Sequence, residues 1–384
     1  MKRLFVGLLA LTLCAAMLLT GCVAEETPGS PGTAPGSAAP QVPAAPSGLK
    51  PGEGAEKAAV ILGGARDDYG FNYNAYLLAQ AIEKDLGIPC VIKENVPPTA
   101  DVEGVIEELI AQGCRIIFPS QFGYLEYSKN VAKRHPDVAF YSLPITDYVG
   151  ENFSIIHGEV QDPWYVNGAL AGLYTKTGKL GFVGSLPIPD VIVAIDAFAL
   201  GAQSVNPDVE VIAVFTGAWD DTGLQTTSVN QLIDSGCDVI APFQDNMKTI
   251  IEVCAKRGAR AFGCNSDAKD LDPDTWMSAT ITDWSGYIPY MKAALEGNYE
   301  TVNVSGGYGK NLIANARWGD NIPQEMIDQV EQIQKDIMSG KIHVFEGPVY
   351  NQKGELMFQE GYKPTIEEIN VIDELVKGVT GTLN

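Results

Sequence analysis

The sequence predicts an α/β fold in which two Rossmann-like lobes with parallel sheets are joined by a hinge. Short apolar runs alternate with amphipathic helical runs between residues 57 and 284, a pattern typical of parallel sheets covered by helices on both faces. The alternation also occurs twice in tandem. A chain of 384 residues is long enough for two domains of roughly 150 residues each.

The tandem repeat is clearest in two eight-residue segments. It aligns QGCRIIFP at 112–119 with SGCDVIAP at 235–242, an offset of 123 residues. At the same offset, Ala132-Lys133-Arg134 matches Ala255-Lys256-Arg257. Strands expected to start near residues 58, 90, 115 and 138 correspond to strands starting near 180, 210, 237 and 260. A shared offset over a whole βα series indicates two similar lobes.

The apolar runs justify each expected element in turn. In the first lobe they predict strands at 58–62, 90–92, 115–118 and 138–141, and helices at 73–86, at 101–112 and up to residue 134. In the second lobe, strand 180–184 precedes a helix whose apolar face repeats at Val191, Ile195, Phe198 and Ala202. Asn206-Pro207 ends that helix, because the residue before a proline disfavours helical dihedrals. The run 209–215 is the next strand.

The alternation weakens after residue 284. Helices are expected at 286–297 and 323–339, and a hairpin at 341–360 that turns at 351–354. Residues 364–379 predict a terminal helix, with Thr365 as its cap and Glu368 at capping-box spacing. We assign 57–162 and 285–320 to an N-terminal lobe, and 163–284 and 321–384 to a C-terminal lobe. Hinge crossings are expected near 160–165, 284 and 320.

The first 22 residues are typical of an export signal. Lys2-Arg3 is a positive n-region, and residues 4–19 form an apolar h-region shorter than a typical membrane span. Leu19-Thr20-Gly21-Cys22 looks like a bacterial lipobox; the alternative is an ordinary signal peptide with a chance cysteine. We expect signal peptide 1–21 to be removed, Cys22 to carry lipid, and 22–56, rich in Ala, Pro, Gly and Ser, to be a disordered tether. The predicted location is the extracytoplasmic face of the cell membrane.

Charge and cysteine content exclude several classes of partner. The formal net charge of −22 becomes −24 once Lys2 and Arg3 are removed. Such a chain is repelled by nucleic acid and by anionic lipid surfaces, and phosphorylated ligands are disfavoured. Five cysteines remain in the exported domain, at 90, 114, 237, 254 and 264. An odd number without C-x-x-C spacing favours buried small hydrophobes over a zinc site or a disulfide framework.

The sequence carries no recognised catalytic motif. It has no G-x-S-x-G, no H-E-x-x-H and no P-loop. The three histidines, His135, His157 and His343, lie far apart and outside the predicted strand-end loops, so a histidine-dependent triad is disfavoured. Gly63-Gly64 does not match G-x-G-x-x-G. We therefore expect no enzyme activity, no cofactor and no metal.

Aromatic and polar residues gather in the loops that follow the predicted strands. In open parallel sheets, ligands bind beyond the carboxyl ends of the strands, and two lobes would place two sets of such loops across a cleft. Flat rings can stack on a flat ligand, while carboxylates and amides accept its N–H and O–H groups. The candidates from these loops are Asp67, Tyr69, Phe71, Asn72, Gln121, Phe122, Trp219, Asp220, Asp245, Asn265 and Asp267.

Structural roles remain open for most of these candidates. Phe71 and Phe122 could be core residues, and Trp219 could be a partly buried structural residue at a lobe edge. Several polar candidates could instead cap helices or turns. These are Asn72 before a helix at Tyr73, Asp245 before a helix at Met247, and Asp267 before a short turn.

Several runs resemble the basic membrane protein (BMP) family of substrate-binding lipoproteins. They include Asn95-Val96-Pro97, the segment 165–172 (YVNGALAG), Pro187-Ile188-Pro189 and Thr216-Gly217-Ala218-Trp219. The run 197–208, AFALGAQSVNPD, is similar to the branch related to purine and nucleoside binders. This resemblance implies a type I periplasmic-binding-protein fold and delivery of a purine nucleoside or purine base to an ABC transporter permease.

On matching positions, the resemblance implies ligand contacts for six residues. These are Phe71, Phe122, Trp219, Asp245, Asp267 and, as a further candidate, Trp284. The chain departs from the family where it reads TDWSG at 282–286 instead of W-x-W-G, and in its first loop, DDYGFNYN at 67–74. We expect a monomer. An alternative function is that of a ligand-sensing surface lipoprotein coupled to a membrane signalling partner.

Overall fold

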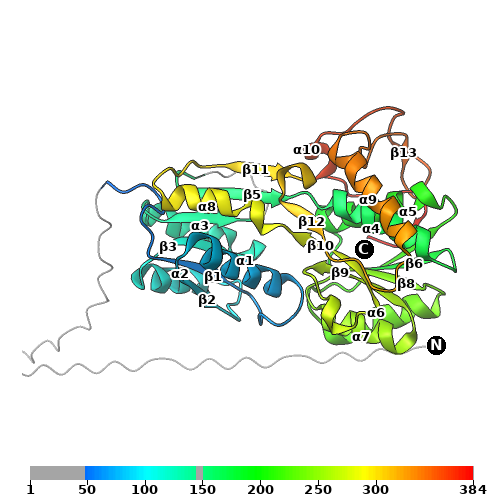
Figure 1. The fold of residues 1–384 in the computed structure, drawn as a ribbon, viewed down its shortest axis with the longest axis horizontal. Helices are drawn as coiled ribbons and strands as arrows, with labels where there is room; N and C mark the ends of the chain where they lie inside the picture. The colour runs from blue at the N-terminus through cyan, green and yellow to red at the C-terminus, as the bar shows by residue number, and fades with distance from the viewer. Residues whose placement is uncertain (1–47, 144–149, 384) are drawn as a thin grey trace, which may run out of the picture. The chain divides into compact units, whose positions relative to one another are not determined.

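The computed structural model describes residues 48–143 and 150–383, so the predicted signal peptide, Cys22 and most of the tether lie outside the described residues. The described strands form two large sheets and one hairpin (Figure 1). In the first sheet the order is β11-β5-β4-β3-β1-β2, and in the second it is β12-β10-β9-β8-β6-β7-β15. We call each sheet with its covering helices a lobe. Within the two large sheets, all neighbouring strands pair parallel except β10 and β12, which pair antiparallel.

The first lobe contains most elements up to residue 158 and two that return after residue 286. Its elements are β1 (Lys57–Ile61), α1 (Phe71–Leu86), β2 (Cys90–Lys93), α2 (Asp101–Ala111), β3 (Cys114–Pro119), η1 (Phe122–Tyr124), α3 (Leu125–Arg134), β4 (Ala139–Ser142), β5 (Phe153–Gly158), α8 (Ile288–Leu295) and β11 (Asn303–Gly306).

The second lobe repeats this series and then adds a C-terminal segment. Its main elements are α4 (Gln161–Tyr174), β6 (Lys179–Gly184), α5 (Pro189–Val205), β7 (Glu210–Phe215), α6 (Thr222–Asp234), β8 (Val239–Phe243), α7 (Met247–Arg257), β9 (Arg260–Asn265), η2 (Lys269–Leu271), β10 (Trp276–Thr282), β12 (Ile313–Asn315) and α9 (Gln324–Met338). The C-terminal segment, residues 345–383, holds β13 (Val349–Tyr350), β14 (Leu356–Phe358), α10 (Ile366–Ile369) and β15 (Val379–Thr380).

The two sheets share one strand order, which confirms the tandem repeat. The order β2-β1-β3-β4-β5 in the first sheet matches β7-β6-β8-β9-β10 in the second. Parallel strands point their carboxyl ends the same way, so each lobe gathers its strand-end loops at one edge of its sheet. The predicted α/β fold with two parallel-sheet lobes is therefore confirmed.

The chain passes between the sheets three times. It leaves β5 for α4, leaves β10 for α8 through η3 (Trp284–Gly286), and leaves β11 for β12 through η4 (Tyr308–Lys310). The third crossing comes before Ile313, because β12 pairs with β10 in the second sheet. It therefore precedes the expected position near residue 320.

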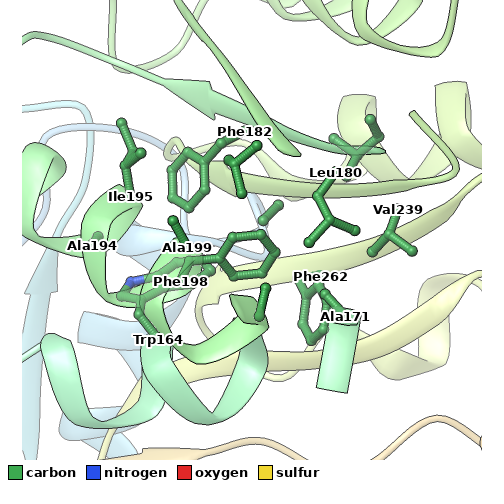
Figure 2. Close-up of a cluster of buried hydrophobic side chains, with 14 of the residues drawn as sticks. Trp164, Ala171, Leu180, Phe182, Ala194, Ile195, Phe198, Ala199, Val239 and Phe262 are labelled. Atoms are coloured by element: carbon green, nitrogen blue, oxygen red, sulfur yellow. The ribbon is translucent and has the colours of Figure 1, made fainter. Parts of the chain in front are cut away.

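The core of the second lobe depends on two glycines. A Cβ on Gly168 of α4 would lie 1.9 Å from the carbonyl oxygen of Phe198, and one on Gly201 of α5 would lie 2.0 Å from that of Tyr165. The two helix backbones can approach this closely only without those side chains. Figure 2 shows Trp164, Phe182 and Phe198 packed in the same cluster. The run 197–208 therefore serves helix packing at least in part.

The folded part begins earlier than the predicted tether end at residue 56. Ala55 is buried in the first-lobe core, and Gly52 N–H donates to the Asp137 carbonyl at 2.9 Å. Gly52 has a φ of 74°, a conformation that glycine adopts readily, and a side chain there would meet Ala294 and Ala139. The last residues of the predicted tether are therefore part of the first lobe.

The C-terminal segment corrects one prediction and confirms another. The hairpin exists, since β13 and β14 pair antiparallel. The terminal helix expected over 364–379 is only the four residues of α10, although Thr365 and Glu368 do form the capping box. The chain leaves the helix because Val379–Thr380 pairs with β7 and the Val376 N–H donates to Asp196 at 2.9 Å.

Two smaller expectations concern cysteines and membrane spans. All five cysteines of the described residues are free thiols, and four of them are buried, as the sequence predicts. Across 48–143 and 150–383, no helix combines the length and apolarity needed to cross a membrane.

Candidate functional site

The first strand-end loop of the first lobe touches the strand-end loops of the second. This loop, residues 66–70, follows β1. The Met247 N–H at the start of α7 donates to the Asp68 carbonyl at 3.2 Å, and the Ser266 hydroxyl donates to the Tyr69 carbonyl at 2.7 Å. A Cβ on Gly70 would lie 1.6 Å from the Asp245 carbonyl oxygen. The two edges identified from the sequence therefore face each other.

Asp68 fixes the shape of this loop and the start of α1. Its carboxylate accepts the backbone N–H groups of Gly70, Asn72 and Tyr73 at 2.9–3.0 Å, and the Asn72 amide at 2.8 Å. Burial raises the pKa of Asp68 although these hydrogen bonds oppose the shift. Asn72 lies inside the first turn of α1 rather than before it, and its amide oxygen accepts the Gly64 N–H at 3.0 Å. Both residues hold the backbone of the site.

Asp245 is a half-buried candidate whose carboxyl is left uncommitted. It lies after β8, and its carboxyl has no hydrogen-bond or ion-pair partner among the described residues. Burial raises the pKa of Asp245 well above its usual value, and the charges of Asp68 and Asp220 raise it further. The N-cap of α7 is Asn246, and it too makes no side-chain cap bond, so the capping alternative for Asp245 is not realised.

Trp219 lies directly beside Asp245. The Asp245 N–H donates to the Trp219 carbonyl at 2.9 Å, and the Trp219 ring is 6.4 Å from that of Phe243. Trp219 is 37% exposed, so part of its surface remains accessible. Buried Gln244 holds the loop by donating to the Thr216 hydroxyl at 3.0 Å. The backbone hydrogen bond thus fixes next to each other a residue with an exposed aromatic ring and a residue with a free acid.

Asp267 has a strong partner that the sequence did not indicate. Its two carboxylate oxygens accept Nε and Nη2 of Arg317 at 2.6 and 3.1 Å, and one also accepts the Lys269 N–H at 3.0 Å. The contact to Lys269 realises the turn-capping alternative. Arg317 also donates to Asp270 at 3.1 Å. A ligand would therefore have to share the Asp267 carboxylate with a guanidinium.

The other predicted residues are dispersed over different environments. Asn265 ends β9 with a φ of 69°, and Phe71 is half-buried at the start of α1. Gln121 packs over Gly63, where a Cβ would lie 1.8 Å from its amide nitrogen. Phe122 is 74% exposed, so its core alternative is wrong, and Asp220 is also exposed.

Trp284 lies in the first-lobe core instead of on the surface of the facing loops. It is 8% exposed, its indole N–H donates to the Asn74 carbonyl at 3.0 Å, and its ring meets Phe118 edge-on at 5.6 Å. Its polar atom and its ring are both committed to packing around the second crossing.

Three residues that sequence reasoning missed stand at this edge. Tyr73 stacks on Tyr69 with ring centroids 5.0 Å apart, a pair that its spacing of four residues at the start of a helix could have indicated. Lys248 and Arg317 bring positive charge to an edge otherwise rich in aspartates, and each is paired with an acid. No local motif marks either cation.

Comparisons with known proteins point to one family and one fold. The profile of a family described as ABC transporter substrate-binding protein PnrA-like matches residues 55–344. A purine-binding protein of Brucella abortus (strain 2308) is 32% identical over 331 residues, which cover 85% of this chain and 93% of that one. A putative ABC transporter glucose-binding protein of Haloferax volcanii is 30% identical over 342 residues, covering 88% and 86%. An ABC transporter solute-binding protein of known structure from Conexibacter woesei gives a TM-score of 0.65 at 20% identity, covering 75% of this chain and 98% of that one.

Proposed function

Because the chain belongs to the PnrA-like (Bmp) family of ABC transporter substrate-binding proteins, we propose that it captures a purine nucleoside or a purine base between its two lobes. Its family and fold are those of solute-binding proteins rather than enzymes. Proteins of this family are extracytoplasmic, bind small molecules and deliver them to a permease. In our proposal, lipid on Cys22 anchors this one to the outer face of the cell membrane, where it works as a monomer and hands its ligand to an ABC importer.

The observation that supports a purine is the backbone hydrogen bond that joins Asp245, with its uncommitted carboxyl, to Trp219, with its partly exposed ring. A purine offers a flat face for stacking on an indole, and ring or exocyclic N–H groups for an acid at its edge. The Asp267 carboxylate, shared with Arg317, would accept ribose hydroxyls if the ligand is a nucleoside. Phe71, Phe122 and Asn265 would complete the enclosure on closing. Trp284 supports the site from the core without touching the ligand.

The two relatives name different ligands, one a purine and one, putatively, glucose. A sugar would also find acids and an aromatic ring at this edge, so the ligand class has to be measured. We suggest calorimetry with purine bases, nucleosides, nucleotides and glucose on the exported chain. We expect bases or nucleosides to bind and nucleotides to be rejected, because the net charge is strongly negative.

The site assignment is tested by Trp219→Ala. Loss of a stacking surface should weaken binding at least roughly tenfold, since stacking on one base contributes about 1–3 kcal/mol. Tyr350→Ala is a matched control, because Tyr350 is similarly exposed at 41% but lies on β13. If no purine or nucleoside binds, or if Trp219→Ala binds as the wild type does, the proposal is wrong. Binding of glucose alone would favour the sugar class.

A further inference from the structure

Side chains of the 66–70 loop contact the second lobe. Asp67 and Lys248 of α7 form an ion pair with the Nζ–Oδ2 distance at 3.0 Å. The same ammonium lies 5.3 Å from the centroid of the Tyr69 ring, which is within cation–π range. Tyr69 also packs against the core cluster of the second lobe, and its carbonyl accepts the Ser266 hydroxyl. Lys248 therefore contacts two residues of a single turn that belongs to the other lobe.

The backbone of that turn is held in an unusual conformation. Tyr69 has a φ of 53°, in the left-handed region that residues with a side chain seldom adopt. Such conformations persist where surrounding contacts determine them. Its own lobe supplies the stack on Tyr73, and the other lobe supplies Lys248 and Ser266. The turn is thus shaped in part by the surface on which it docks.

The exposure of Asp67 argues against its predicted role as a ligand contact. Its side chain is 73% exposed, and Lys248 lowers the pKa of its carboxyl by hydrogen bonding and charge. A group that must bind a ligand selectively is usually desolvated by the site around it. Asp67 instead stays largely in solvent and pairs with Lys248 of the other lobe.

From these contacts we propose that Asp67, Tyr69, Lys248 and Ser266 form a latch that holds the two lobes closed and sets the rate of ligand release. The latch rests on the proposed function only in having a ligand to retain; its effect on lobe closure is independent of ligand identity. It reassigns Asp67 and Tyr69 from ligand contact to closure. Lys248 is its central positioning residue, because it contacts both.

The first experiment measures ligand release. We suggest Lys248→Met, which keeps an apolar stem against Tyr69 but removes the charge, and Asp67→Asn. Adenosine dissociation is followed by stopped-flow tryptophan fluorescence. Lys248→Met should accelerate dissociation roughly three- to tenfold, the range expected for loss of an exposed ion pair together with a cation–π contact. Asp67→Asn should have a smaller effect, because it leaves the cation–π contact in place. Association should not slow, because removal of the latch leaves the unliganded protein no less open.

Two further variants separate a latch from a general effect on the fold. The charge swap Asp67→Lys with Lys248→Asp should restore much of the slow release, since it rebuilds the ion pair. Lys256→Met is the matched control, because Lys256 lies on the same helix but away from the first lobe. It forms an ion pair with Glu252 of its own helix at 3.3 Å. Wild-type release should accelerate between about 20 and about 500 mM salt, whereas that of Lys248→Met should not.

Lobe closure is measured separately in protein without ligand, by small-angle X-ray scattering. The radius of gyration should increase in Lys248→Met and fall back in the charge swap, while Lys256→Met should match the wild type. Unchanged release and an unchanged radius in Lys248→Met would overturn the latch. If adenosine and the other purines fail to bind at all, the proposed function is wrong, and scattering alone then decides the latch.

Discussion

At the scale of residues, sequence position identifies the loops of the site but not the partners of their side chains. The strand-end rule places Asp267 at the facing edge, yet its partner Arg317 comes 50 residues later, beyond the third crossing. Trp284 donates to Asn74, which is 210 residues away. Pairs of this kind depend on how the chain crosses between lobes, and no local pattern records that. The ion pair between Lys248 and Asp67, which gives Asp67 its role in lobe closure, could not be predicted for the same reason.

Asp245 is the residue whose substitution is predicted to weaken ligand binding without lowering the stability of the fold. Asp245→Asn keeps the shape of the side chain and removes a carboxyl that burial and neighbouring acids already disfavour in its ionised form. We expect the folded protein to be at least as stable as the wild type at neutral pH. Affinity for the purine should fall at least roughly tenfold, because one acceptor for ligand N–H groups is replaced by a donor.

Calorimetry for affinity and thermal unfolding for stability check this pair of outcomes. Asp221→Asn is a suitable comparison, since Asp221 lies nearby but uses its side chain to accept the Leu224 N–H at 2.9 Å as the N-cap of α6. That variant should lose little affinity. Equal affinities for wild type and Asp245→Asn would remove Asp245 from the site.

Asp196 gives a prediction for the pH dependence of stability. It is fully buried in α5, one oxygen accepts the Val376 N–H, and the other has no partner among the described residues. Burial raises the pKa of Asp196 well above its usual value. A raised folded-state pKa means that its contribution to stability is complete below the unfolded-state pKa and is lost as pH rises through the folded-state pKa.

We therefore expect the free energy of unfolding of the wild type to fall relative to that of Asp196→Asn as pH rises above roughly 4, by up to about 1.4 kcal/mol per pH unit. Urea denaturation at a series of pH values measures both curves. Asp208→Asn, at an exposed position after the same helix, should run parallel to the wild type. Parallel curves for Asp196→Asn would mean that Asp196 does not titrate in this way.

At the scale of elements, the spacing of apolar residues was sufficient to predict a helix or strand wherever that element buries one of its faces. The 123-residue offset identified two series of strands, and the two sheets repeat one order. The terminal helix over 364–379 was wrong because strand pairing with β7 outweighs local helix propensity beyond Ile369. The close approach of α4 and α5 was also not foreseen, although the glycines that permit it were visible in the sequence.

Gly168→Ala tests that helix contact. The added methyl group would lie 1.9 Å from the Phe198 carbonyl oxygen in α5, so one helix has to move. We expect the free energy of unfolding to fall by about 3 kcal/mol, at the upper end of typical overpacking effects. Gly104→Ala in α2 is the matched control, because its methyl group meets nothing within 4 Å. That variant should be stabilised by roughly 0.5–1 kcal/mol, and chemical denaturation distinguishes the two.

At the scale of the whole molecule, the family match ends at residue 344, but the fold does not. The C-terminal segment adds β15 to the edge of the second sheet and contributes apolar side chains to the second-lobe core. It also supplies the Val376 N–H, the hydrogen-bond donor to buried Asp196. The sequence places this segment in the C-terminal lobe, but only the structure reveals that it closes the exposed edge of β7.

Deletion of residues 345–384 is therefore expected to unfold the second lobe rather than trim it. The deletion removes seven buried apolar residues, namely Phe345, Val349, Ile369, Ile372, Leu375, Val376 and Val379. At about 1.5–3 kcal/mol each, their loss is comparable with the entire stability of a typical domain, about 5–15 kcal/mol. It also leaves Asp196 without its donor and uncovers the β7 edge, which favours aggregation.

We expect insoluble protein, or a soluble form without cooperative thermal unfolding. Val371→Ser, at a site 69% exposed in the same segment, should unfold as the wild type does. A truncated chain that melts cooperatively and still binds purine would show that the second lobe is complete at residue 344.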